Sequence, residues 1–179
     1  MILALYEHLH GVETTSGNLA VYDLDRNTAY FGAASLPGRA LVWKVEDQAG
    51  AGEKLAARVE LDPDSEWLLR CDRVDFPPGG IAYRHTHPGP GIRYLLHGAI
   101  RIESGGETRV YHPFEPWFES GPEPVLALAS EAEETAFVRA MLVPREWAGR
   151  RTIRYVDPAD EAKPKLQRAT VFFDQPIEL

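Results

Sequence analysis

The chain contains little of what stabilises or anchors several other classes of protein. Cys71 is the only cysteine, so no internal disulfide can form and the fold cannot depend on oxidation. No apolar run approaches the ~20 residues that a membrane-spanning helix needs. Glu7 and His8 interrupt the first residues, which therefore lack the long apolar region of a secretory signal. We expect a cytoplasmic protein that does not contact membranes.

The chain also has fewer positively than negatively charged residues. The chain has 19 Lys and Arg against 27 Asp and Glu, which gives a net charge of −8. This field repels polyphosphates and argues against a nucleic-acid partner. The glycine-rich nucleotide motifs, the Gly-x-Ser-x-Gly elbow and paired-cysteine knuckles are absent as well. A metal ion or a small neutral or cationic molecule suits the field, whereas an anionic substrate needs a locally basic pocket.

What the sequence does contain predicts an all-β domain. Its 179 residues suit one domain, and 44% hydrophobic residues suffice for a real core. Helical periodicity is weak, and the one expected short helix begins at Asp157-Pro158. Short apolar segments separated by Gly and Pro indicate a sandwich or barrel. We expect strands at 40–45, 66–76, 81–87, 92–96, 99–103, 108–111, 125–129 and 135–143.

One set of spacings carries chemistry. From Gly79 the sequence runs through five residues to the His-x-His pair of His85 and His87, through three more to Gly91, and through six more to Gly98. This frame resembles the first motif of the cupin superfamily, in which a Glu occupies the slot of Gly91. The resemblance covers about 67–144. It implies a single-domain cupin with a double-stranded β-helix, a jelly-roll barrel, which commonly holds a divalent metal ion.

The rest of the chain is expected to belong to the same single domain. We place the cupin core at 62–146, an N-terminal extension that packs on the barrel and adds edge strands at 1–61, and a C-terminal extension at 147–179. Unpaired strand edges invite partners, and cupin barrels commonly pair. We therefore expect a homodimer, by analogy.

The histidine pair has a physical interpretation of its own. Side chains at i and i+2 of a strand point to one face, so His85 and His87 should project together, on the side that also receives Tyr83. Two neutral imidazoles at a barrel mouth can share a metal ion. The alternative is a pair of surface or hydrogen-bonded structural histidines.

The departures from the motif weaken the expected metal site. Gly91 stands in the slot of the metal-binding Glu, and Pro124 stands in the histidine slot of the second motif. Glu119 or Glu123 could complete the shell with a carboxylate, and we favour Glu119, although both could be solvated turn residues. A divalent Fe, Mn, Ni or Zn ion and a metal-free site both remain open.

Three further residues are predicted to line the pocket. Arg93 follows Gly91 by two residues and should point where the absent Glu would have pointed. A guanidinium inside a barrel needs a carboxylate, either from a carboxylate-bearing or enolate-like substrate or from Glu119 or Glu103. Trp117 and Phe118 should supply apolar pocket surface.

These residues lead to two hypotheses about function. In the first, the chain is a small cupin-type enzyme of dioxygenase, isomerase, lyase or cyclase type, whose catalytic residues are His85, His87, Tyr83 and Arg93 and whose metal ligands are His85, His87 and Glu119. Without a metal, a histidine would act as general base and Tyr83 as general acid. In the second, the chain is a non-catalytic ligand-binding or sensor cupin that has lost its metal site, as Gly91 and Pro124 suggest.

Overall fold

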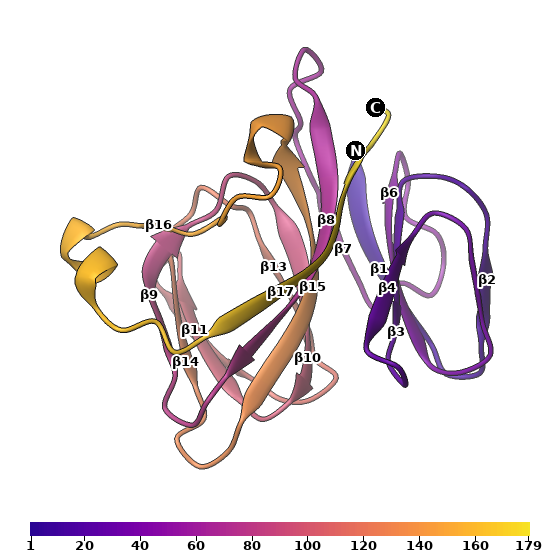
Figure 1. Cartoon of the computed structure of the whole chain (residues 1–179). Coiled ribbons are helices and arrows are strands. Elements are labelled where there is room, and N and C mark those ends of the chain that lie inside the picture. Colours follow the sequence, from indigo (N-terminus) through magenta and orange to yellow (C-terminus); the bar gives the residue numbers. More distant parts are fainter.

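The computed structural model describes residues 1–179, almost all of them in or between antiparallel strands. Three five-stranded sheets and one two-stranded sheet make up the fold. Figure 1 shows the N-terminal sheet standing beside a barrel, with the C-terminal strand running along the barrel. The only helices are two short 3-10 turns, and neither has the length or apolar character to cross a membrane.

Eight consecutive strands form the barrel. They form two sheets in the orders β13-β10-β15-β8 and β12-β11-β14-β9, and the chain crosses between the sheets after every strand except at the β11–β12 hairpin. Apart from that hairpin, strands that follow each other in the chain therefore lie on opposite walls of the barrel, which is the strand order of a jelly roll. The predicted all-β class and the jelly-roll barrel are confirmed. The strands are β8 (Trp67–Phe76), β9 (Ile81–Thr86), β10 (Gly91–His97), β11 (Ile100–Ser104), β12 (Glu107–Tyr111), β13 (Pro116–Glu119), β14 (Val125–Ala129) and β15 (Thr135–Pro144).

The local alternation of apolar and polar residues explains which strands could be predicted from the sequence. All the expected strands are present within about two residues. The missed barrel strand, β13, is only four residues long and begins at Pro116, so it offers little alternation to detect. The expected helix is a 3-10 turn over Pro158–Ala162, in which the Asp157 carboxylate accepts a hydrogen bond from the Ala159 backbone N–H.

The N-terminal segment differs from the expectation in one respect, because it adds no edge strand to the barrel. It forms its own sheet in the order β4-β3-β6-β1-β7, together with a β2-β5 hairpin. The strands are β1 (Ile2–His8), β2 (Val12–Thr14), β3 (Leu19–Asp23), β4 (Thr28–Phe31), β5 (Ala34–Leu36), β6 (Ala40–Glu46) and β7 (Leu55–Arg58).

This sheet packs face to face on the outside of the barrel. Leu5 and Trp43 share a core with Cys71 and Ile92 of the barrel, and the Trp43 indole N–H donates a hydrogen bond to the Ile92 carbonyl at 3.1 Å. A second cluster, which includes Val42, covers the other face of the same sheet. The central strands are thus buried on both faces, and their near-continuous apolar runs follow from that.

The C-terminal extension supplies the edge strands instead. β17 (Arg168–Pro176) pairs with β8, and β16 (Arg154–Tyr155) pairs with β9. One strand is therefore added to each barrel sheet. The 3-10 turn η1 (Arg145–Trp147) and the loop after it connect β15 to β16, and this loop passes over the barrel cavity described below.

Candidate functional site

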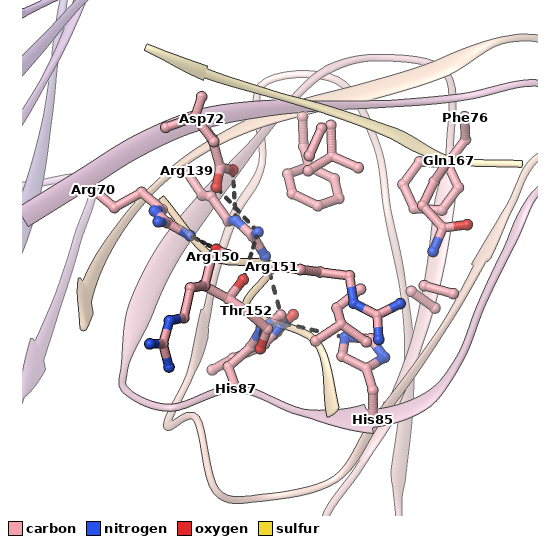
Figure 2. Close-up of a pocket in the computed structure, with 18 of the residues that line it drawn as sticks. Arg70, Asp72, Phe76, His85, His87, Arg139, Arg150, Arg151, Thr152 and Gln167 are labelled. Carbon is pink, nitrogen blue, oxygen red and sulfur yellow. Dashed lines mark hydrogen bonds and ion pairs between the residues drawn. The ribbon is translucent and has the colours of Figure 1, made fainter. Parts of the chain in front are cut away.

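The barrel encloses a cavity of about 220 Å³ with two chemically different ends. Its apolar end is walled by Val74, Phe76, Ile102, Trp117 and Phe137, together with small alanines. Its polar end carries Arg70, Asp72, His85, His87, Arg139 and Thr152 (Figure 2). The other polar lining residues are Glu119, Arg150, Arg151 and Gln167. A molecule bound here would have an apolar body and one polar end.

The two histidines converge inside the barrel. His85 and His87 are 4% and 5% exposed, and their Nε2 atoms lie 3.1 Å apart with the ring planes at 84°. Figure 2 shows both rings pointing into the cavity from β9 and the turn that follows it. They are neither solvated nor turned apart, so the pair forms the polar centre of the cavity.

Backbone carbonyls fix the tautomer of each ring. His85 Nδ1 lies 2.7 Å from the Tyr83 carbonyl oxygen, and His87 Nδ1 lies 3.1 Å from the Thr152 carbonyl oxygen. A carbonyl oxygen only accepts hydrogen bonds, so both Nδ1 atoms carry the proton and donate it. Burial lowers the pKa of His85, and burial together with Arg139 lowers the pKa of His87 well below its usual range. Both rings are therefore neutral, and both Nε2 atoms are unprotonated acceptors in the lining of the cavity.

Tyr83 does not line this cavity, contrary to the sequence prediction. A β-bulge interrupts β9, because His85 pairs with Val125 whereas Ala82 pairs with Ala127. Ala82 and His85 therefore face inward. The Tyr83 ring instead lies against Tyr155 and Lys163 outside the cavity. The bulge shifts the alternation on which the prediction relied.

Arg93 is buried but is paired within the protein. Its guanidinium is fully buried, with Nη2 2.6 Å from Glu119 Oε2 and Nη1 donating a hydrogen bond to the Gly91 carbonyl oxygen at 2.6 Å. Glu119 Oε1 also accepts a hydrogen bond from the Trp117 indole N–H at 2.8 Å. Burial lowers the pKa of Arg93 to about 10, opposed by Glu119, and the side chain is not part of the cavity surface. Of the two alternatives, the internal salt bridge to Glu119 is the one that forms.

Gly91 makes room for this arrangement. A Cβ atom at Gly91 would lie 2.7 Å from the Ala140 carbonyl oxygen and 3.0 Å from Arg93 Nη1. The guanidinium of Arg93 thus occupies the space that a side chain at Gly91 would need. The glycine in the glutamate slot is required above all by the Ala140 carbonyl oxygen and Met141 Cγ, each 2.7 Å from the position of that Cβ, and then by Arg93.

Arg139 is a second buried cation, and it lies at the cavity itself. It contacts both oxygens of Asp72, with Nε 2.7 Å from Oδ1 and Nη2 3.2 Å from Oδ2. Its Nη1 lies 3.4 Å from His87 Nε2. A third buried pair joins Arg70 to Asp174. Sequence reasoning missed Asp72, Arg70 and Thr152, because their importance depends on which strands become neighbours.

Phe118 also lies away from the cavity. It packs against the core between the barrel and the N-terminal sheet, on the opposite face of β13 from Trp117. Trp117 does line the cavity, with its ring edge-to-face on Phe137 at a centroid distance of 5.3 Å. Only the first of the two predicted aromatic pocket residues is therefore placed to contact a bound molecule.

The donor set does not fit a tightly held divalent metal ion. No group of three or more His, Cys, Asp or Glu side chains in the chain is arranged to hold a metal. Glu119 Oε2 lies 3.6 Å from His87 Nε2, but Arg93 already neutralises this carboxylate. The Arg139 guanidinium adjoins the His87 lone pair and repels a cation. Two imidazoles alone hold such an ion weakly, so the predicted set of His85, His87 and Glu119 is not assembled.

Comparison with known proteins gives only distant structural matches. No protein-family model matches the chain, and no curated protein does. One similar solved structure is an RmlC-like cupin from Shewanella frigidimarina, with 14% identity over 50% of this chain and 94% of the other. A cupin 2 conserved barrel domain protein from Leptotrichia buccalis has 15% identity over 79% and 73% of the two chains, and the polyketide cyclase RemF from Streptomyces resistomycificus has 23% identity over 56% and 69%. The TM-score is 0.40 for each of the three.

The strand order itself defines the class of this protein, a jelly-roll barrel of cupin type. The resemblance predicted from the glycine and histidine frame is thereby confirmed at the level of the fold. The metal-binding set that the resemblance implied is not.

The neutral histidines make stability depend on pH. Because burial holds the folded-state pKa of His85 and His87 below 6.5, the unfolded chain binds protons that the folded chain excludes as the pH falls through 6.5. We expect the free energy of unfolding to be full above that pH and to fall below it, by up to about 1.4 kcal/mol per pH unit for each histidine. Urea unfolding between pH 5.5 and 8 measures this slope.

A pair of variants isolates the histidine contribution. His87→Gln should flatten the slope below pH 6.5, whereas the exposed His112→Gln should leave it unchanged. Equal slopes in wild type and His87→Gln would contradict the assignment of a buried neutral His87.

Proposed function

We propose that this chain is a cupin-type enzyme that works without a bound metal ion and carries out acid–base chemistry, of isomerase, lyase or cyclase type, on a small organic molecule. The single observation that carries the proposal is the bare Nε2 atom of His85, which faces the cavity with no hydrogen-bond donor assigned to it. A buried imidazole with a fixed tautomer and a free lone pair is a general base.

The charge balance of the cavity describes the substrate. The two buried arginines that line the cavity, Arg70 and Arg139, are each paired with a carboxylate of the protein, as is Arg93 behind the cavity wall. Arg150 and Arg151 also line the cavity, but they are exposed residues of the loop that passes over it. The opposite end of the cavity is apolar and partly aromatic. These features support a neutral, mainly apolar substrate, in place of the carboxylate-bearing one that Arg93 suggested from the sequence.

The neighbouring groups support proton transfer to His85. The Tyr83 carbonyl holds the His85 ring in the tautomer that leaves Nε2 free. The partial negative charge on His87 Nε2, 3.1 Å away, stabilises a newly protonated His85. Burial lowers the pKa of His85 most, Glu119 opposes this, and Arg139 and Arg93 lower the pKa further. Groups fixed before the reaction lower its barrier because they need not reorganise.

One observation favours a second candidate, a non-catalytic binding protein. Tyr83, the expected general acid, lies outside the cavity, and the two buried arginines that line it, Arg70 and Arg139, are engaged by carboxylates. A site with a base but no dedicated acid could serve binding alone. The experiment below separates the two candidates.

Carbon-acid exchange tests the proposed function. Cyclohexanone and 1-indanone are incubated in D2O with protein that was purified without a histidine tag and treated with EDTA, and loss of the α-proton signal is followed by NMR. We expect exchange above the buffer rate that is unaffected by metal removal, and that falls about 10²-fold or more in His85→Gln, the usual contribution of a general base. His112→Gln, at an exposed site, is the matched control.

The other outcomes decide between the alternatives. Binding of the ketones without exchange would favour the non-catalytic candidate. Exchange that requires Fe, Mn, Ni or Zn, with one metal ion per chain lost in a His85→Gln, His87→Gln double variant, would replace the proposal with a metal-assisted enzyme. A protein that neither binds the ketones nor catalyses their exchange would overturn the proposal.

A further inference from the structure

The histidine pair lacks one hydrogen-bond donor. Each Nδ1 donates to a backbone carbonyl, which uses the single proton of each neutral ring. His87 Nε2 has a donor nearby in Arg139 Nη1, at 3.4 Å. His85 Nε2 has only the lone pair of His87 Nε2 opposite it, at 3.1 Å. Two unprotonated acceptors at that distance repel each other, and a buried acceptor without a donor is costly.

We propose, building on the proposed function, that the cavity takes a ring-sized molecule with a single hydroxyl group of the phenol or enol class, and that this hydroxyl donates a hydrogen bond to His85 Nε2. Such a group supplies the one donor that the pair lacks. When the proton transfers, the O–H bond breaks, its electron pair stays on the oxygen, and an Nε2–H bond forms on His85. The new N–H then donates back to the phenolate or enolate oxygen, while the lone pair of His87 Nε2, 3.1 Å away, stabilises the charge on His85.

The cavity discriminates against the two obvious competitors. A carboxylate is already ionised near neutral pH, so it brings no proton, and it would enter a site whose three buried arginines are already paired. An ether of the same shape brings no donor and leaves His85 Nε2 unsatisfied. A site built around a hydrogen bond rejects an analogue that lacks the partner group.

Size and shape favour a single substituted ring. The cavity measures about 220 Å³, while an apolar cavity of about 150 Å³ accommodates benzene. Trp117, Phe137 and Phe76 provide aromatic walls at the apolar end, where a ring can pack edge-to-face or offset. The hydroxyl would then reach the histidines at the polar end.

Three probes of one shape test this inference on the unaltered protein. 4-Nitrophenol, 4-nitroanisole and 4-nitrobenzoate are titrated separately at a pH at which free 4-nitrophenol is mainly protonated, and binding is measured by calorimetry. We expect the phenol to bind at least about 10-fold more tightly than the ether, as one hydrogen bond to a buried group implies, and the benzoate to bind most weakly. In His85→Gln the preference for the phenol over the ether should shrink, whereas His112→Gln should retain it.

Each remaining outcome overturns the inference in a recognisable way. Equal affinity for phenol and ether would exclude the hydroxyl contact, while ketone exchange by His85 would show that the proposed function still stands. Tightest binding of the benzoate would assign the site to anions and return Arg139 or Arg93 to the role of ligand contact. Failure of all three probes to bind, together with no ketone exchange, would overturn both the inference and the proposed function.

Discussion

Arg139→Met is expected to lower the free energy of unfolding by about 3–5 kcal/mol, because it leaves the carboxylate of Asp72 buried without its partner. Asp72 is 1% exposed, and both of its oxygens contact Arg139. Removing one member of such a pair strands a charge in a medium that solvates it poorly. Urea unfolding at pH 7.5 measures the loss.

A double variant and a surface pair provide the controls. Arg139→Met combined with Asp72→Leu should recover most of the stability, because no charge is then left unpaired. Arg145→Met, which breaks the exposed pair with Glu66, should change stability by at most about 1 kcal/mol. If Arg139→Met lowers the free energy of unfolding no more than Arg145→Met does, the buried pair contributes no more to stability than an exposed one.

The barrel was predictable because its signals are local. Turns rich in Gly and Pro separate short apolar segments, and the spacing from Gly79 to Gly98 marks β9, β10 and the turn that carries the chain from one barrel sheet to the other. The N-terminal sheet gave no comparable signal. Strands β1 and β6 are buried on both faces, so their apolar runs do not alternate, and nothing in them says whether they extend a barrel sheet or stack on it.

The site was predictable only where it depends on neighbours along the chain. His85 and His87 lie two residues apart, so their convergence follows from strand geometry. The position of Tyr83 depends on a bulge set by pairing with β14, and the sequence of β9 does not reveal that bulge. Arg139 faces Asp72 because β15 pairs with β8 across 67 residues of chain. Contacts of this kind require the strand register, which spacing in one segment does not provide.

Gly91, Arg93 and Glu119 form one structural unit. Gly91 pairs with Glu119 across β10 and β13, while Arg93 lies back over Gly91 to reach the Glu119 carboxylate. The glutamate missing from the cupin motif has therefore been replaced by a buried ion pair, and this pair excludes a cation from the same space. Restoring the missing residue alone should not restore a metal site.

Gly91→Glu is accordingly expected to destabilise the protein by about 3 kcal/mol or more and to create no metal site. Overpacking against the Ala140 carbonyl and Arg93 Nη1 costs about 1–3 kcal/mol, and the second carboxylate adds the cost of burying a charge that competes with Glu119 for one guanidinium. Urea unfolding measures the first effect, and zinc titration with a competing chromophoric chelator measures the second.

Two further variants separate shape from charge at Gly91. Gly91→Ala should lose only the packing part, about 1–3 kcal/mol. Gly106→Asn, at an open turn with a φ of +80° that Asn adopts more readily than other side chains, should cost much less. A stable Gly91→Glu variant that binds one zinc ion per chain through His85 and His87 would show that the Arg93–Glu119 ion pair breaks at little cost in free energy. In that case the barrel would be a metal site lacking one ligand, and the proton-transfer role argued for His85 would lose its physical basis.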